Sequence, residues 1–257
     1  MNIEGLFRGK DKWKKVNFLR ETAAVEKPLF IVTLESHLSD DIENKEIAIS
    51  DYNLYRADRL NRVQGGIAMY LRNPLMIEEE NMKTFSNSVC ELLILKIKDL
   101  NANIVSLYRP PDTKVNEFVE CLQVVEDYFK EKNLTEKIMI FGDFNFPHVK
   151  WNSYEDTVIP TISGAPKEEQ IQFEKLLELT DSLFLEQLVV KPTRVNNTLD
   201  LIFTNDEDFI NEISITKSGI SDHNLITASL NKEYKQGENT TNLIQEESCS
   251  KLEKYAF

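Results

Sequence analysis

Acidic, amide and histidine side chains recur in this chain at the ends of short apolar runs. In chain order they are Glu35 after FIVTL, Tyr108 after NIVSL, Asp143 and Asn145 after IMIFG, Asp200 inside TLDLIF, and Ser221, Asp222 and His223 before NLITASL. A single acidic residue in such a place is usually a helix cap or a turn former. Strand ends in a layered α/β fold, however, converge on one rim where pockets form, so the whole set predicts a site.

The combination supplies the groups that hydrolysis of a phosphodiester needs. That reaction requires a cation at the phosphate oxygens, an oriented water, and donors for the developing negative charge. Mg²⁺ takes oxygen ligands and keeps several waters, so one or two carboxylates such as Glu35 suffice. Asp143 would orient and deprotonate the water, and Asn145 would hold the phosphate beside it.

His223 would donate to the phosphate if a carboxylate fixes its tautomer and favours the cationic form, and Asp200 is our candidate for that carboxylate. Arg109 is a candidate phosphate contact because it lies beside Tyr108 on the same rim. His37 follows Glu35 closely, but a Mg²⁺ site does not favour imidazole, so we expect it on the rim without a ligand role.

Eight apolar runs have the length and composition of strands covered on both faces. They span residues 30–34, 66–71, 92–97, 104–108, 138–141, 199–203, 213–215 and 225–230. Helical spacing of apolar residues predicts helices over about 11–25, 115–131 and 167–182. Strands that outnumber helices, many in adjacent pairs, predict an α/β fold with two packed mixed sheets and helices outside, rather than one doubly wound parallel sheet.

Two stretches lack this patterning. Residues 152–166, NSYEDTVIPTISGAP, have turn chemistry, and we expect a surface loop there. From 231 to 257 the chain is polar and aperiodic, which predicts a disordered tail or a linker. The globular domain is therefore expected over 1–230.

Composition and charge narrow the class of protein. The formal charge of −13 counts against tight, purely electrostatic binding of nucleic acid, although an enzyme that gathers carboxylates around a divalent cation carries local negative charge. The three cysteines, Cys90, Cys121 and Cys249, are widely spaced and predict neither a disulfide framework nor a zinc site. No signal peptide or membrane-spanning run is present, so we expect an intracellular protein of the nucleus or cytoplasm, without a membrane partner.

At these residues the chain resembles the endonuclease/exonuclease/phosphatase superfamily, and within it the apurinic-type endonuclease domain of non-LTR retrotransposons. The segments that carry the resemblance cover nearly all of 1–230: NIEGL (2–6), LESHL (34–38), GGIAMYLR (65–72), SLYRPP (106–111), IFGDFNFPHVKW (140–151), KPTRVNNTLDLIFTN (191–205) and ISDHNLI (220–226). The resemblance implies a DNase I-like four-layer α/β sandwich. It also implies that the first strand is truncated at its N-terminus, because the chain begins one residue before Asn2.

The resemblance implies residue roles as well. At the metal site, Glu35 matches the metal-binding glutamate, Asn2 matches the asparagine that supports the site, and Asp222 matches the final aspartate. At the scissile phosphate, Tyr108 matches the tyrosine, Asn145 matches the phosphate-binding asparagine, and Asp143 matches the aspartate that orients the water. His223 matches the catalytic histidine, and Asp200 matches its partner. Thr193 matches a residue that lines the site, and Ser221 precedes the aspartate and histidine as in the family. Thr193, Ser221 and Arg109 are thus the candidate substrate-binding residues, whereas His148 inherits no role.

These expectations favour a Mg²⁺-dependent DNA endonuclease, with Mn²⁺ as a possible substitute, that nicks one strand of double-stranded DNA and leaves a 3′-hydroxyl. In a full retroelement that hydroxyl primes reverse transcription. We expect a monomer, and no reverse transcriptase domain follows in these 257 residues. Two alternatives remain open: a phosphomonoesterase of the same superfamily that acts on a phosphoinositide or a similar substrate, and an inactive, truncated remnant or binding module.

Overall fold

Two six-stranded sheets dominate the computed structural model, which describes residues 1–8, 12–59, 64–78, 82–86, 90–130, 132, 136–155, 157–231 and 255–256. Sheet A has the order β12 (Ile210–Lys217), β13 (Asn224–Leu230), β14 (Tyr255–Ala256), β1 (Phe30–Leu34), β3 (Ile67–Arg72) and β2 (Tyr52–Ala57). Sheet B has the order β10 (Glu186–Gln187), β11 (Asp200–Thr204), β7 (Lys137–Asp143), β6 (Ala102–Tyr108), β5 (Glu91–Ile97) and β4 (Lys83–Ser86).

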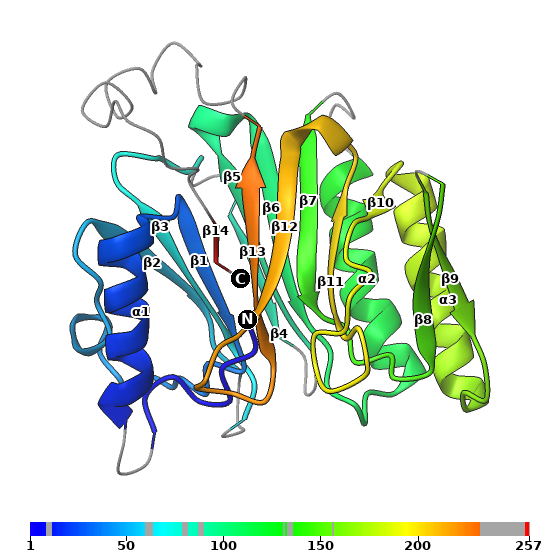
Figure 1. Cartoon of the computed structure of the whole chain (residues 1–257), viewed down its shortest axis with the longest axis horizontal. Helices are drawn as coiled ribbons and strands as arrows, with labels where there is room; N and C mark the ends of the chain where they lie inside the picture. Colours follow the sequence, from blue (N-terminus) through cyan, green and yellow to red (C-terminus); the bar gives the residue numbers. More distant parts are fainter. Residues whose placement is uncertain are drawn as a thin grey trace.

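Three long helices cover the outer faces of the two sheets (Figure 1). Helix α1 (Lys12–Glu26) lies on sheet A, whereas α2 (Val115–Lys130) and α3 (Lys167–Ser182) lie on sheet B. Short 3-10 helices span Asn44–Glu46, Lys98–Leu100 and Glu207–Phe209. The four layers confirm the α/β sandwich predicted from the sequence, and each long helix begins and ends within a residue of its predicted range.

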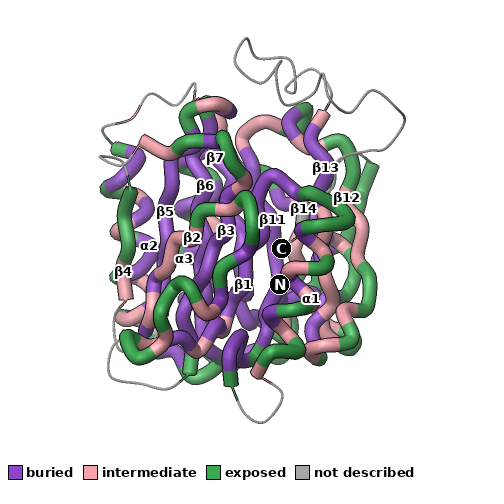
Figure 2. The backbone as a smooth tube through the Cα atoms, turned by 90° about the vertical axis from the view of Figure 1, so that its left-hand side faces the viewer, coloured by how far each residue is buried: buried purple, intermediate pink, exposed green. Residues whose placement is uncertain are grey.

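Apolar side chains fill three interfaces between these layers. One cluster lies between the two sheets and joins residues such as Val32, Met69 and Phe141. The other two lie between sheet A and α1 and between sheet B and the pair α2 and α3. Figure 2 shows the buried strands as a continuous band inside the molecule. Because both faces of the central part of each sheet are covered, the central strands carry near-continuous apolar runs, and polar residues collect where these strands end.

Both ends of the chain meet in the middle of sheet A (Figure 1). Asn2 forms a parallel bridge with Leu34 of β1, and β14 pairs with β1 at Ile31 and with β13 at Thr227 and Ala228. The tail expected over 231–257 thus contributes one strand, β14, while residues 232–254 and 257 lie outside the described residues.

The predicted surface loop at 152–166 is wrong, because the structure forms a hairpin there. Strands β8 (Val149–Tyr154) and β9 (Thr157–Ile162) pair in antiparallel register. Trp151 of β8 packs against Phe173 of α3 and Phe203 of β11, with ring centroids 5.9 and 6.0 Å away. This tertiary contact buries one face of a strand whose own sequence is mostly polar.

None of the described helices is long and apolar enough to cross a membrane.

Candidate active site

Four neighbouring strands of sheet B place a row of polar residues at one level. The register pairs Glu91 of β5 with Tyr108 of β6, Tyr108 with Asp143 of β7, and Asp143 with Asp200 of β11. In-register partners on adjacent strands have neighbouring Cβ atoms. The ladder itself therefore brings Tyr108, Asp143 and Asp200 together, as the sequence predicted.

Gly142 permits the close approach of β6 and β7 just before Asp143. A Cβ atom at this position would lie 1.8 Å from the backbone oxygen of Leu107. No side chain fits at that separation, so the glycine of the GDFN segment is required by the packing of the two backbones.

Sheet A contributes residues that lie just beyond its strands. Glu35 follows β1 with a φ of 51°, a left-handed conformation that turns its side chain away from the strand path. Asn2 uses its side-chain amide nitrogen twice, donating to Glu35 Oε1 at 2.7 Å and to Asp143 Oδ2 at 2.9 Å. The hydroxyl of Tyr108 also donates to Glu35 Oε1, at 2.7 Å. Asn2 thereby joins the carboxylate of one sheet to that of the other.

His223, just before β13, lies between two aspartates of sheet B. Its Nδ1 is 2.8 Å from Asp200 Oδ2, and its Nε2 is 3.7 Å from Asp143 Oδ2. The imidazole is 1 % exposed, so bulk water does not compete for these contacts. The arrangement fixes the tautomer, because Nδ1 donates to Asp200 and Nε2 points toward Asp143.

Thr193 and Ser221 hold the backbone of this histidine and aspartate pair. The Thr193 hydroxyl oxygen accepts from the backbone N–H groups of Leu199 and Asp200, each at 3.0 Å. The Ser221 hydroxyl oxygen accepts from the backbone N–H of His223 at 3.1 Å. Thr193 is fully buried, so its hydroxyl supports the site from beneath.

The pKa values of Asp143 in sheet B and of Glu35 beside sheet A are shifted in opposite directions. Burial, with the neighbouring Asp200 charge, raises the pKa of Asp143 to about 7. Burial also opposes ionisation of Glu35, but hydrogen bonds from His37, Asn2 and Tyr108 outweigh it and lower the pKa of Glu35 to about 2. Glu35 is thus the fixed anion, and Asp143 can exchange a proton near neutral pH.

The pKa of His223 is raised. Burial lowers it, but the hydrogen bond and the charge of Asp200 together raise it above the ordinary value, and Asp143 adds to this effect. The protonated imidazole is therefore favoured where it lies between the two aspartates.

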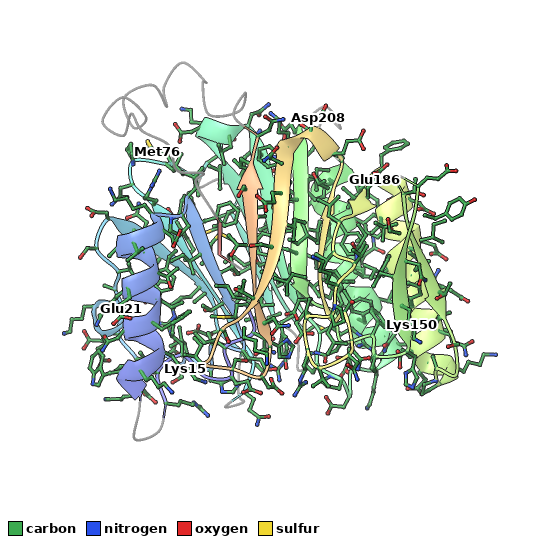
Figure 3. All side chains as sticks on the ribbon, in the orientation of Figure 1. Lys15, Glu21, Met76, Lys150, Glu186 and Asp208 are labelled. Atoms are coloured by element: carbon green, nitrogen blue, oxygen red, sulfur yellow. The ribbon has the colours of Figure 1, made fainter. Side chains whose placement is uncertain are left out.

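The outer edge of the site is acidic and more exposed. Asp222 has a side chain that is 45 % exposed, and its Oδ2 lies 2.6 Å from Nη2 of Arg194. Burial and the nearby carboxylates of Asp222 and Glu35 raise the pKa of Glu4. Lys15 of α1 donates to the backbone oxygen of Glu4 and marks this edge at the bottom of Figure 3. Sequence reasoning missed Arg194, although this residue lies within the KPTRVNNTLDLIFTN segment that carries the resemblance.

The donors of the site suit a divalent cation. Burial and neighbouring carboxylates raise the pKa values of Glu4 and Asp143, and a cation would relieve the repulsion between these charges. One ligand atom from each of Asp143, Asp200 and His223 lies within 4.8 Å of the others, so this group could hold a metal ion. Glu35 and Asp222, which both lie close enough to Glu4 to raise its pKa, carry oxygen ligands of the kind that Mg²⁺ prefers.

Asn145 and Arg109 interlock next to this site. Asn145 has a φ of 49°, and its side-chain Nδ2 donates to the backbone oxygen of Arg109 at 2.9 Å. The Arg109 side chain is only 3 % exposed and donates to backbone oxygens. We expected Arg109 to contact the phosphate directly, but its side chain lies in the interior of the protein.

Two further histidines lie near the rim. Nε2 of His37, which we expected on the rim, is 3.3 Å from Glu35 Oε2. His148 pairs instead with Glu169 of α3, and Gln172 of α3 bonds to Arg109. No sequence motif indicated Glu169 or Gln172, because both are polar residues within an ordinary amphipathic helix.

Comparison with known proteins shows what this chain is similar to. A family model described as endonuclease-reverse transcriptase matches residues 102–227. No curated protein matches the chain.

Solved structures share the fold at low sequence identity. The endonuclease domain of TRAS1, a telomere-specific non-LTR retrotransposon, is 13 % identical with a TM-score of 0.52, over 81 % of this chain and 89 % of its own. The 3′-5′ exonuclease NExo from Neisseria meningitidis is 14 % identical with a TM-score of 0.64, over 90 % and 97 %. An AP endonuclease from Archaeoglobus fulgidus is 12 % identical with a TM-score of 0.60, over the same shares.

The layered fold is that of DNase I-like proteins, and the family match makes this chain similar to the endonuclease/exonuclease/phosphatase superfamily. Within it, the chain is similar to the endonucleases of non-LTR retrotransposons, as its sequence motifs predicted.

Proposed function

We propose that this chain is a Mg²⁺-dependent endonuclease that cuts one strand of double-stranded DNA and leaves a 3′-hydroxyl. One observation carries the proposal: Asp143 lies between the amide of Asn2 at 2.9 Å and the imidazole of His223 at 3.7 Å. A buried carboxylate beside a buried, oriented imidazole is the pair that water activation and phosphate protonation require. The match to the endonuclease-reverse transcriptase family model and the retrotransposon origin of TRAS1 support a DNA substrate.

Asp143 would orient the attacking water and take its proton. Its carboxylate is held on one oxygen by Asn2 and on the other by the backbone N–H of Asn145, at 3.1 Å. The raised pKa of Asp143, about 7, suits a base at neutral pH, because proton transfer is most efficient when the pKa lies near the working pH.

His223 would donate from Nε2 to the phosphate, since its Nδ1 already faces Asp200. The raised pKa of His223 favours the protonated donor. Tyr108 and the Asn145 side chain would contact the scissile phosphate from the sheet B side. Glu35 would hold the metal ion with Asp222, and bound Mg²⁺ would neutralise charge on the phosphate and on the leaving oxygen.

Purified protein mixed with supercoiled plasmid and Mg²⁺ tests this proposal. We expect nicked circles whose ends a DNA polymerase extends directly, since extension needs a 3′-hydroxyl. Chelation of the metal ion with EDTA should abolish the nicks, and the Asp143→Asn variant should lower their rate about 10³-fold. Intact plasmid after incubation with folded protein, Mg²⁺ and Mn²⁺ would contradict the proposal, and an undiminished nicking rate in Asp143→Asn would point to a contaminating nuclease.

A phosphomonoesterase is the second candidate. One similar structure, at 14 % identity, is that of the 3′ phosphatase NExo from Neisseria bound to product DNA hairpin. Release of inorganic phosphate from a 3′-phosphorylated oligonucleotide or an inositol phosphate, without plasmid nicks, would favour this candidate. An inactive remnant would show neither activity, and its melting temperature would not respond to Mg²⁺.

We further propose that the chain acts as a monomer on DNA in the nucleus or cytoplasm. A reverse transcriptase domain is expected in full-length relatives of this branch, where it would extend the 3′-hydroxyl that the nick creates.

A further inference from the structure

The loop that follows β7 is braced from behind by a buried arginine. Nη1 of Arg109 donates to the backbone oxygens of Phe144 and Asn145, each at 2.9 Å. The main chain of Arg109 adds two bonds: its N–H donates to Asp143 O, and its oxygen accepts from the Asn145 side chain, again at 2.9 Å each. One residue therefore makes four hydrogen bonds to the segment that carries Asp143 and Asn145.

The guanidinium is locked in this position by aromatic rings. Its central carbon lies 4.3 Å from the ring centroid of Phe146 and 5.4 Å from that of Phe118. Burial lowers the pKa of Arg109 to about 10, which reflects the cost of keeping a cation away from water. A side chain enclosed in this way has a fixed plane, and it cannot reach a substrate on the rim without leaving its partners.

Helix α3 supplies the final support. Nη2 of Arg109 donates to Oε1 of Gln172, whose Nε2 donates to the backbone oxygen of Thr113 at 2.6 Å. Glu169, three residues earlier on the same face of the helix, accepts from the backbone N–H of His148 at 3.3 Å and lies 2.8 Å from its Nδ1. Helix α3 thus holds the loop near its start through Gln172 and at its end through Glu169.

We propose that Arg109 and Gln172 are positioning residues for the reaction, with Glu169 and His148 as a weaker second brace. Asn145 has a φ of 49°, a left-handed conformation that is uncommon for residues other than glycine but that asparagine tolerates, and the hydrogen bonds from Arg109 hold it there. The two carbonyl oxygens bonded to Arg109 flank the Asn145 position and fix the direction of its side chain. This inference rests on the proposed function, and it assigns the arginine of the YRPP segment to the interior of the enzyme.

The Arg109→Lys variant separates a positioning role from direct phosphate contact. Lysine keeps the charge but has no planar fork, so it cannot hold both carbonyl oxygens and Gln172 together. We expect the single-turnover nicking rate at saturating protein to fall about 10- to 100-fold, because small misplacements of catalytic groups have effects of that size. The protein concentration that gives half the maximal rate should stay within about threefold of the wild-type value.

Salt dependence of DNA binding gives a readout that a purely structural role does not move. Affinity for a short duplex is measured in EDTA, where no cutting occurs, over a range of salt concentrations. In Arg109→Gln, which removes the charge, loss of a phosphate contact would reduce the slope of log affinity against log salt by about 1, whereas a positioning role leaves the slope unchanged. A reduced slope in Arg109→Gln, or a wild-type nicking rate in Arg109→Lys, would overturn the inference.

Two further variants guard against misfolding as an explanation. Gln172→Leu leaves Arg109 in place and removes its side-chain acceptor, so we expect a smaller loss of nicking rate with the same unchanged salt slope. Arg20→Lys is the matched control, because Arg20 on α1 also donates to two backbone oxygens, those of Ala48 and Glu46, and belongs to no part of the site. Its nicking rate should equal that of the wild type.

The side-chain amide resonance of Asn145 tests the inference apart from activity. We expect it to move in Arg109→Lys and Gln172→Leu but not in Arg20→Lys, with the dispersed spectrum of a folded protein retained. If the wild type fails to nick DNA, the proposed function fails while this resonance still reports on positioning. An unmoved resonance in a folded Arg109→Lys variant contradicts the brace.

Discussion

The two sheets supply the candidate active site in different ways. Sheet B contributes Tyr108, Asp143 and Asp200 from the strands themselves, at positions paired in the ladder. Sheet A contributes Glu35 and His223 from the chain just outside β1 and β13, where side-chain hydrogen bonds determine their positions. The backbone ladder thus aligns one half of the site, and polar contacts align the other half against it.

This difference also decides which carboxylate titrates. Asp143 is fixed within the sheet and fully buried beside Asp200, so burial and then repulsion raise its pKa to about 7. Glu35 lies outside the ladder, where three donors can gather around it and lower its pKa to about 2. A rigid, buried position yields a proton acceptor, whereas a loop position yields a permanent anion suited to a metal ion.

The largest effect is expected from Asp143→Asn, which removes the proton acceptor and leaves the shape unchanged. The nicking rate should fall about 10³-fold, within the range for loss of a general base. Stability should change in the opposite direction. The folded pKa of about 7 exceeds the ordinary value of 3.8, so the wild type loses stability as pH rises between these values.

Metal-free thermal unfolding at several pH values measures this second effect. Asparagine never ionises, so the variant should be more stable than the wild type at pH 8, by on the order of 1–3 kcal/mol, and the difference should shrink toward pH 4. A variant less stable than the wild type at pH 8 would show that the Asp143 charge is well solvated. It would contradict the difference that we infer between Asp143 in sheet B and Glu35 beside sheet A.

Glu35→Gln tests the other half of the comparison. We expect the nicking rate to fall about 100-fold, and the rise in melting temperature that saturating Mg²⁺ gives the wild type, on the order of 5–10 °C, to disappear. The pKa of Glu35 is lowered to about 2 from 4.5, so this carboxylate stabilises the fold above pH 4.5 and loses that contribution as pH falls toward 2.

The variant should therefore be less stable than the wild type at pH 7, without metal, and about equal to it near pH 2. Asp208→Asn is the matched control, since Asp208 lies on the opposite edge of the molecule from the rim (Figure 3). A Glu35→Gln protein that still gains stability from Mg²⁺ would place the metal ion on Asp143, Asp200 and His223 instead.

The sequence predicted the parts of the site that follow from chain direction. Asp143 and Asp200 adjoin apolar runs, so their arrival at one rim follows from the layered fold. The register that sets them side by side depends on long-range pairing, which no local pattern encodes. The burial of Arg109 was not predicted either, because it depends on rings from α2 and from the loop after β7 that close over the guanidinium.

The hairpin of β8 and β9 was missed for a similar reason. Pro160 within β9 and the polar residues of β8 indicate a loop when only neighbours in sequence are considered. The strand β8 forms because Trp151 finds Phe173 and Phe203, residues that are distant in the chain. Tertiary contacts of this kind override local propensity.

Thr193→Val should have a moderate effect on stability and on the nicking rate, because Thr193 supports Asp200 of sheet B, the partner of His223. Valine keeps the shape but removes the oxygen that accepts from the backbone N–H groups of Leu199 and Asp200. Two buried donors would lose their partner, and we expect a loss of about 1–3 kcal/mol in the free energy of unfolding. The nicking rate should fall as Asp200 shifts relative to His223.

Thr193→Ser is the matched control, because it retains the hydroxyl and should keep both the stability and the rate close to wild type. Urea unfolding measures the change in free energy. If valine lowers the nicking rate without any loss of stability, Thr193 contacts the substrate, as the family resemblance implied, and does more than support the ladder.

The smallest effect is expected from His148→Ala, which removes the side-chain contact between His148 and Glu169, the weaker second brace of the loop after β7. The His148 side chain is 40 % exposed, so its pair with Glu169 should contribute no more than about 1 kcal/mol to stability. The nicking rate should fall about 2- to 5-fold, which corresponds to less than about 1 kcal/mol. Lys175→Ala, which breaks an exposed ion pair with Glu178 on the same helix, is the control and should leave the rate unchanged. A His148→Ala loss as large as that of Arg109→Lys would show that His148 contacts DNA, because a partly exposed pair cannot position the loop as firmly as a buried guanidinium.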